Sequence, residues 1–219
     1  MISKSPRWRT SETEGRRTCR PSPSVPPALR YAICNFLCFA LAALVAGAAS
    51  ANVYRTDAEA LKETFRDAEA VEERKLVLSR EERTAIEKTL GSKLSDVVMG
   101  AADSFTFHVG MRGGKIYRLA SAITALARSE PMRLLVVLSA EGAVESVEIL
   151  AFHEPPQYKP SKKFLAQFQG ASSENPPEHR RNVRNITGAT ITSRQASHAV
   201  HLVLLVARAR LKAASHDVP

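Results

Sequence analysis

Hydroxyl side chains gather in one short stretch near the C-terminus, and their spacing suits the binding of a phosphate group. Between Thr187 and Ser193, four of the seven residues carry a hydroxyl, and Gly188, which lacks a Cβ, would let a ligand approach the backbone. A long apolar segment follows, so we expect a helix to begin here, with Thr192 as its N-cap and Gln195 completing a capping box. A helix start presents unpaired N–H groups and a partial positive charge, and both favour a phosphate. An ordinary capped helix behind a threonine-rich turn is the alternative.

The elements that must position this stretch are predicted as β-hairpins with helices before and after them. Alternating apolar residues and glycine-containing turns predict strands at 75–78, 104–111, 116–120, 132–138 and 144–151. Apolar residues at helical spacing predict helices at 52–74, 80–90, 161–169 and 193–213. The grouping indicates an α+β fold, an antiparallel sheet of hairpins with flanking helices and a long buried C-terminal helix.

Two of these helices carry clear signals at their ends or on their faces. Ser79 and Glu82 form a capping box before the second helix, and Gly91 is placed to end it. The last helix has apolar residues on most faces, so we expect it to be buried. Its main stripe consists of Ala196, Ala199, Val200, Val203, Leu204, Ala207 and Leu211.

The first 51 residues have the composition of an export signal. Residues 1–30 are basic, residues 36–45 are apolar, and Ala49-Ser50-Ala51 matches a small-residue cleavage site. We expect a signal peptide, cleaved before Asn52. With residues 46–51 added to the apolar run, an uncleaved membrane anchor is the alternative.

Removal of this leader changes what the composition implies. The leader takes with it seven of the 31 basic residues, two of the 22 acidic residues and all three cysteines. The remaining chain then has 24 basic and 20 acidic residues, and its net charge falls from +9 to +4. We therefore expect no nucleic-acid partner, no disulfide and no thiolate chemistry in the mature protein.

The hydroxyl-rich stretch also resembles a known motif. Thr187-Gly188-Ala189-Thr190-Ile191-Thr192-Ser193 is similar to the flavinylation signature of the FMN-binding domain family, which includes flavinylated components of the sodium-translocating NADH:quinone reductase and of the Rnf complex. The resemblance covers residues 100–213, between an N-terminal helical region at 52–99 and a tail at 214–219, and is closest to small secreted members. His153-Glu154-Pro155-Pro156 is similar to a second family element, which lies against the flavin.

The resemblance implies a role for each matching residue. Thr190 is the threonine to which a flavin transferase joins the phosphate of FMN as a phosphoester. Thr187, Gly188 and Ala189 form the cradle for the phosphate and the flavin, with Thr192 beside them. Glu154 and Pro155 lie near the isoalloxazine ring.

One position departs from the family signature. The family has an aspartate where this chain has Arg184, and Glu178 is the nearest upstream acid. A guanidinium can still bind phosphate oxygens in a bidentate manner. Covalent FMN, non-covalent FMN and a domain without flavin therefore all remain open.

The resemblance and the leader together predict a flavin electron carrier on the outer side of the cytoplasmic membrane. FMN would do the chemistry, with a flavin transferase and a membrane or periplasmic redox partner. The sequence offers no Ser–His–Asp arrangement and no catalytic residue that we would name, which favours an electron-transfer component over a stand-alone enzyme. His198 and His201 are spaced to reach one metal ion but lack a third ligand, so we predict no metal site. A secreted accessory or binding domain of the same fold is the alternative.

Overall fold

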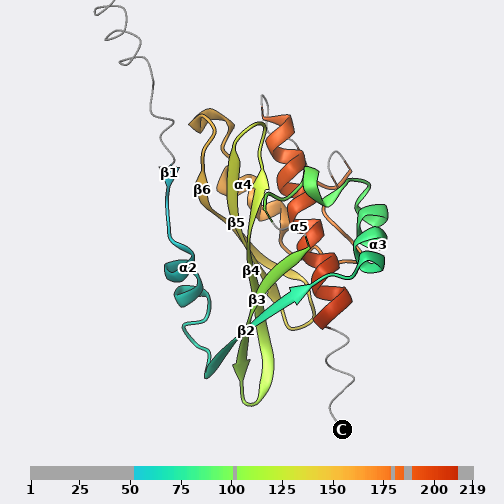
Figure 1. The fold of residues 1–219 in the computed structure, drawn as a ribbon. Helices are drawn as coiled ribbons and strands as arrows, with labels where there is room; N and C mark the ends of the chain where they lie inside the picture. Colours follow the sequence, from blue (N-terminus) through green and yellow to red (C-terminus); the bar gives the residue numbers. More distant parts are fainter. Residues whose placement is uncertain (1–51, 101–102, 179–180, 185–188, 212–219) are drawn as a thin grey trace, which may run out of the picture. The chain divides into compact units, whose positions relative to one another are not determined.

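A single antiparallel sheet forms the centre of the fold in the computed structural model, which describes residues 52–100, 103–178, 181–184 and 189–211 (Figure 1). The strands are β1 (Asn52–Val53), β2 (Ala70–Val77), β3 (Ser104–Arg112), β4 (Lys115–Leu126), β5 (Pro131–Ser139) and β6 (Val144–Phe152). They lie in the order β1-β6-β5-β4-β3-β2, with all neighbours antiparallel. The predicted α+β class is confirmed.

Helices cover both faces of this sheet. The α-helices are α2 (Asp57–Thr64), α3 (Arg80–Leu90), α4 (Lys162–Leu165) and α5 (Thr190–Leu211), and the 3₁₀ helices are η1 (Leu94–Asp96), η2 (Pro156–Tyr158) and η3 (Ala166–Phe168). α3, α4 and α5 pack on one face, and α2 packs on the other (Figure 1). Because β5 lies between both layers, its buried residues alternate between them: Leu134 and Val136 join the larger core, while Leu135 and Val137 join the smaller one.

The terminal helix is the most buried helix of the described residues, as the apolar residues on most of its faces predict. Its residues from Ala196 to Ala207 are buried, except for His198 and Leu205, which are partly exposed. Within the described residues, no helix has both the length and the apolar character needed to cross a membrane. The leader predicted at residues 1–51 lies outside the described part of the chain.

The capping signals of α3 are confirmed in detail. The Ser79 side chain accepts a hydrogen bond from the backbone N–H of Glu82, and the Glu82 carboxylate accepts one from the N–H of Ser79. Gly91 ends the helix with φ +70°, the left-handed conformation that glycine adopts without a steric penalty.

The predicted helix at 52–74 is wrong over most of its length. Only Asp57–Thr64 is helical, β1 precedes it, and β2 begins at Ala70 rather than at the predicted residue 75. The N-terminal region 52–99 therefore supplies both edge strands of the sheet in addition to two helices. Exposure explains the error, because β2 lies at an edge and most of its residues are exposed, so it lacks the apolar alternation of a half-buried strand.

The predicted N-cap of the terminal helix is also wrong. α5 begins at Thr190, and the backbone N–H of Ser193 donates to the carbonyl of Ala189 at 3.0 Å, so the first helical turn is already closed at that point. Thr192 is a buried residue inside this turn. Gln195 does not fold back toward Thr192, because its side-chain amide donates to the carbonyl of Asp96 at 3.0 Å.

Candidate functional site

The start of α5 presents one exposed hydroxyl. Thr190 is exposed as the first residue of the helix, whereas Ala189 before it and Thr192 after it are buried. Ile191, beside Thr190, is 42% exposed, which is unusual for a large apolar residue on this helix. Thr190 and Ile191 thus form a small accessible surface that contains one hydroxyl group and one apolar side chain.

The first turn of α5 suits an anion. It contains no acidic side chain, and the helix is 22 residues long, so its N-terminal partial positive charge is unopposed by a residue of its own turn. A phosphate bonded to, or resting beside, the Thr190 hydroxyl would lie within this field. Thr187 and Gly188, the other predicted cradle residues, lie outside the described residues.

Arg184 is anchored through its backbone while its side chain is exposed. Its N–H donates to Gln167 Oε1 at 2.8 Å, and its carbonyl accepts from Gln167 Nε2 at 3.2 Å. The Gln167 side chain thus holds the backbone at Arg184 against η3, just before the chain enters the signature. No sequence pattern pointed to this role for Gln167, because the two residues are 17 positions apart and no local spacing links them.

Glu154, expected near the isoalloxazine ring, has a structural role in the sheet. Its side chain is 5% exposed, and its Oε1 accepts hydrogen bonds from the N–H groups of Arg128, Ser129 and Glu130 at 3.1, 2.6 and 3.0 Å, and from the Ser129 hydroxyl at 3.2 Å. The carboxylate therefore holds together the turn between β4 and β5. Burial raises the pKa of Glu154, but these hydrogen bonds outweigh it and leave the pKa below its ordinary value.

Pro155, next to Glu154, is exposed and leads into η2. The N–H of Tyr158 donates to the Pro155 carbonyl at 3.0 Å, so a hydrogen bond between residues three positions apart closes this bend. A rigid, exposed proline at this position offers a flat apolar surface.

A chain of contacts places the Glu154 turn and the start of α5 at the same end of the sheet. Gln195 of α5 bonds Asp96 in η1, and the segment that follows η1 pairs with the end of β4 through Val98 and Ala125. The β4–β5 turn bound by Glu154 begins directly after β4. Figure 1 shows this turn and the first residues of α5 at the same end of the sheet.

Comparison with known families identifies the segment that carries these features. The model of the FMN-binding domain matches residues 128–204, from the β4–β5 turn to the middle of α5. Residues 128–204 are an FMN-binding domain. The match includes Glu154, Pro155, Arg184 and the whole hydroxyl-rich stretch. No curated protein matches the chain.

The residues of the FMN-binding domain fit the phosphate end of the cofactor. Thr190 supplies an accessible hydroxyl, α5 supplies the positive end of a long helix, and Arg184 supplies an exposed guanidinium from an anchored backbone. FMN is accordingly the cofactor of this domain, and flavin-based electron transfer is the chemistry that it supports. Among the described residues, no group of three or more His, Cys, Asp or Glu side chains is placed to hold a metal ion.

Proposed function

We propose that the protein is an exported electron carrier in which FMN is joined to Thr190 through a phosphoester. The observation that carries this proposal is the position of Thr190, an exposed hydroxyl at the first residue of a long helix within an FMN-binding domain. The two other hydroxyl residues of the signature that the structure describes, Thr192 and Ser193, are both buried. Thr190 is thus the described threonine of the signature that a transferase can reach.

The chain contributes binding and placement, while the flavin supplies one- or two-electron chemistry when bound. The start of α5 would stabilise the phosphate, which carries one negative charge as a phosphodiester, and Arg184 adds a formal positive charge six positions before Thr190 in the sequence. Glu154 fixes the β4–β5 turn at the same end of the sheet as the start of α5, and Pro155 presents an apolar surface for the ring. A covalent link would keep a small diffusible cofactor from being lost outside the cytoplasm.

The proposal has three further parts: the protein is exported, a flavin transferase attaches the FMN, and a membrane or periplasmic protein is the redox partner. Export is supported by the basic start, the apolar run and the Ala49-Ser50-Ala51 motif of the sequence. The transferase follows from the resemblance of Thr187–Ser193 to the flavinylation signature.

The decisive experiment is intact-mass analysis of the full chain produced together with a flavin transferase. An ester between Thr190 and FMN adds the mass of FMN less one water, and peptide mapping should place the gain on the peptide that contains Thr190. Thr190→Ala should abolish the gain. Thr192→Ser is the matched control, because it keeps a buried hydroxyl in the same turn and should leave the adduct in place. An adduct that persists in Thr190→Ala would move the attachment to another residue.

A second candidate, an FMN-binding domain without a covalent bond, is favoured by Arg184. If the arginine prevents attachment, wild-type protein should release its FMN on denaturation, and Arg184→Asp should gain covalent flavin. A colourless wild-type protein that takes up no FMN at all would leave the accessory-domain alternative and contradict the carrier.

A further inference from the structure

The outer edge of β6 is open over five residues in the middle of the strand. At one end, β1 pairs with Ala151 and Phe152, and the N–H groups of Tyr54 and Arg55 donate to the carbonyl of Leu150. At the other end, Val144 exchanges two backbone hydrogen bonds with Gly170 and Ala171, both 2.8 Å long. Between these ends, within the described part of the chain, 145–149 makes no backbone hydrogen bond on its outer side. This open edge spans about 17 Å, enough for a short added strand.

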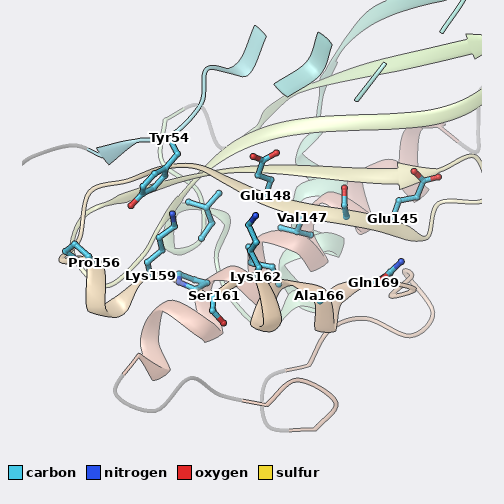
Figure 2. Close-up of a pocket in the computed structure, with 14 residues that line it drawn as sticks. Tyr54, Glu145, Val147, Glu148, Pro156, Lys159, Ser161, Lys162, Ala166 and Gln169 are labelled. Atoms are coloured by element: carbon cyan, nitrogen blue, oxygen red, sulfur yellow. The ribbon is translucent and has the colours of Figure 1, made fainter. Parts of the chain in front are cut away.

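A groove of 780 Å³ runs along this open edge, between β6 and the segment that contains α4 (Figure 2). Its volume falls within the roughly 300–1,000 Å³ range of ligand-binding clefts. Val147, Ile149 and Leu165 line its apolar part. The groove therefore offers unpaired backbone groups beside an apolar floor, the two features by which proteins bind an extended peptide as an extra strand.

The acidic residues of the groove are already paired. Glu145 accepts from Arg118 at 2.7 Å, and Glu148 accepts from Arg55 at 3.1 Å. Arg118 therefore offsets the charge of Glu145, while Arg55 shares its charge between Glu148 and Glu63, which does not line the groove.

On the opposite side of the groove, the positive charges of the lysines are not offset by carboxylates in this way. Lys159 lies with Nζ 3.1 Å from the centre of the Tyr54 ring, and no carboxylate of the described residues lies within 4 Å of the Lys162 ammonium. Figure 2 shows both amino groups directed from the α4 side toward the strand. The uncompensated charge of the groove is therefore positive, and the cation–π contact holds Lys159 in place.

We propose that this groove binds an extended acidic segment of a partner protein, which adds a strand to β6 and places its carboxylates against Lys159 and Lys162. Charge argues against two other occupants. The chain's own residues 1–51 carry seven basic and two acidic residues and would be repelled. A second copy that pairs β6 with β6 would bring the lysines of two grooves toward one another. The proposal is independent of whether Thr190 carries flavin.

The test uses the full chain and a fluorescein-labelled nonapeptide that alternates valine and glutamate, with binding measured by fluorescence anisotropy. We expect binding that weakens as NaCl is raised, because exposed charges are screened by salt. Lys162→Glu should weaken it about five- to tenfold, since an attractive surface pair becomes a repulsive one. Lys163→Glu is the matched control: it is the next residue of α4, equally exposed, and does not line the groove. It should leave the affinity nearly unchanged.

Two further probes separate strand addition from simple charge attraction. A nonapeptide with N-methyl groups on alternate backbone nitrogens loses the hydrogen-bond donors of one strand edge, and when that edge is the one facing β6 it should bind at least tenfold more weakly. Amide chemical shifts in NMR spectra should move at Glu145–Ile149 when the unmodified probe is added.

Four results would overturn the proposal. They are the absence of binding at millimolar peptide, equal losses for Lys162→Glu and Lys163→Glu, undiminished binding of the N-methylated peptide, and shift changes confined to the start of α5. A fifth such result is competition by added FMN, which would assign the groove to the flavin. Thermal unfolding of both lysine variants checks that the fold is retained.

Discussion

At the scale of single residues, Glu154 has the largest structural role of the side chains expected at the site. One carboxylate oxygen serves three backbone N–H groups and a hydroxyl of the β4–β5 turn, all within a nearly closed environment. Hydrogen bonds to a charged group contribute about 1.5–3 kcal/mol each to stability, roughly twice the value of neutral ones. The turn thus depends on the negative charge as well as on the shape of this side chain.

Glu154→Gln should lower the free energy of unfolding by about 1–2 kcal/mol, because the amide oxygen remains an acceptor but without charge. Because the pKa of Glu154 is lowered in the folded protein from its ordinary value of 4.5, its contribution is present above pH 4.5 and is lost as the pH falls through the folded pKa. Urea denaturation from pH 7 to pH 3 should therefore show a smaller acid loss in the variant. Glu130→Gln, an exposed residue of the same turn, should behave as wild type.

At the residue scale, the sequence indicated the signature residues but not the residues that form hydrogen bonds with Glu154 and Arg184. Thr190 stands out in the sequence because hydroxyls cluster around it, and in the structure it is exposed. The bonds of Glu154 to a turn about 25 positions earlier, and of Gln167 to Arg184, depend on how the sheet folds back. Local spacing holds no information on such contacts.

At the scale of elements, α2 packs on the sheet through Phe65, the residue that ends this helix. Phe65 packs over Gly110 of β3, at a register shift between Gly110 and Met111. A Cβ at position 110 would lie 2.6 Å from the Phe65 ring and 2.8 Å from the Tyr117 ring, closer than real contacts allow. The missing side chain of Gly110 is what lets both rings sit on this face of the sheet.

Gly110→Ala should therefore destabilise the fold by about 1–3 kcal/mol, the usual cost of overpacking a core. Urea denaturation gives the value directly. In a Phe65→Ala background the same substitution should cost less, because the nearest ring is gone. Equal costs in both backgrounds would show that the two residues do not compete for this space.

The sequence predicted the strands and helices that have a buried face, but it predicted only the end of β2, whose residues are mostly exposed. The hairpins β3–β4 and β5–β6 and the capped helix α3 carry the periodicity and the turn glycines that burial demands. β2 carries Glu72, Glu73, Arg74 and Lys75 in a row, a composition typical of an exposed edge strand that resists pairing with other molecules. Such a strand has no core-facing pattern by which the sequence could reveal it.

At the scale of the whole molecule, His201 makes the stability of the core sensitive to mild acid. It is 9% exposed on α5, and its Nε2 has no hydrogen-bond partner among the described residues. Burial lowers the pKa of His201, and the charge of Glu178 acts in the opposite direction without cancelling this effect. The folded core therefore favours the neutral imidazole.

The free energy of unfolding should fall as the pH drops below about 6.5, the ordinary pKa of histidine in the unfolded chain. Protons bind the unfolded chain more readily in this window, so the loss continues until the folded pKa is reached. His201→Leu should flatten the decline between pH 7 and pH 5 and remove the unpaired nitrogen. His108→Gln, at a partly exposed position on β3, should keep the decline. A decline of the same size in His201→Leu would assign it to another group.

The arrangement of the sheet has a consequence for the order in which the protein folds. Both edge strands come from the first 26 described residues, since β1 pairs with β6 and β2 pairs with β3. Asn52 must wait for Phe152, 100 positions later, before β1 has a partner, whereas β2 pairs with β3, the next strand along the chain. The sheet therefore cannot be completed on its β1 side until β6 has been synthesised. Pairing of β1 with β6 is then the closing step of the sheet, and the amides of Tyr54 and Arg55, which donate to the carbonyl of Leu150, should be the last to gain protection in pulse-labelled hydrogen exchange.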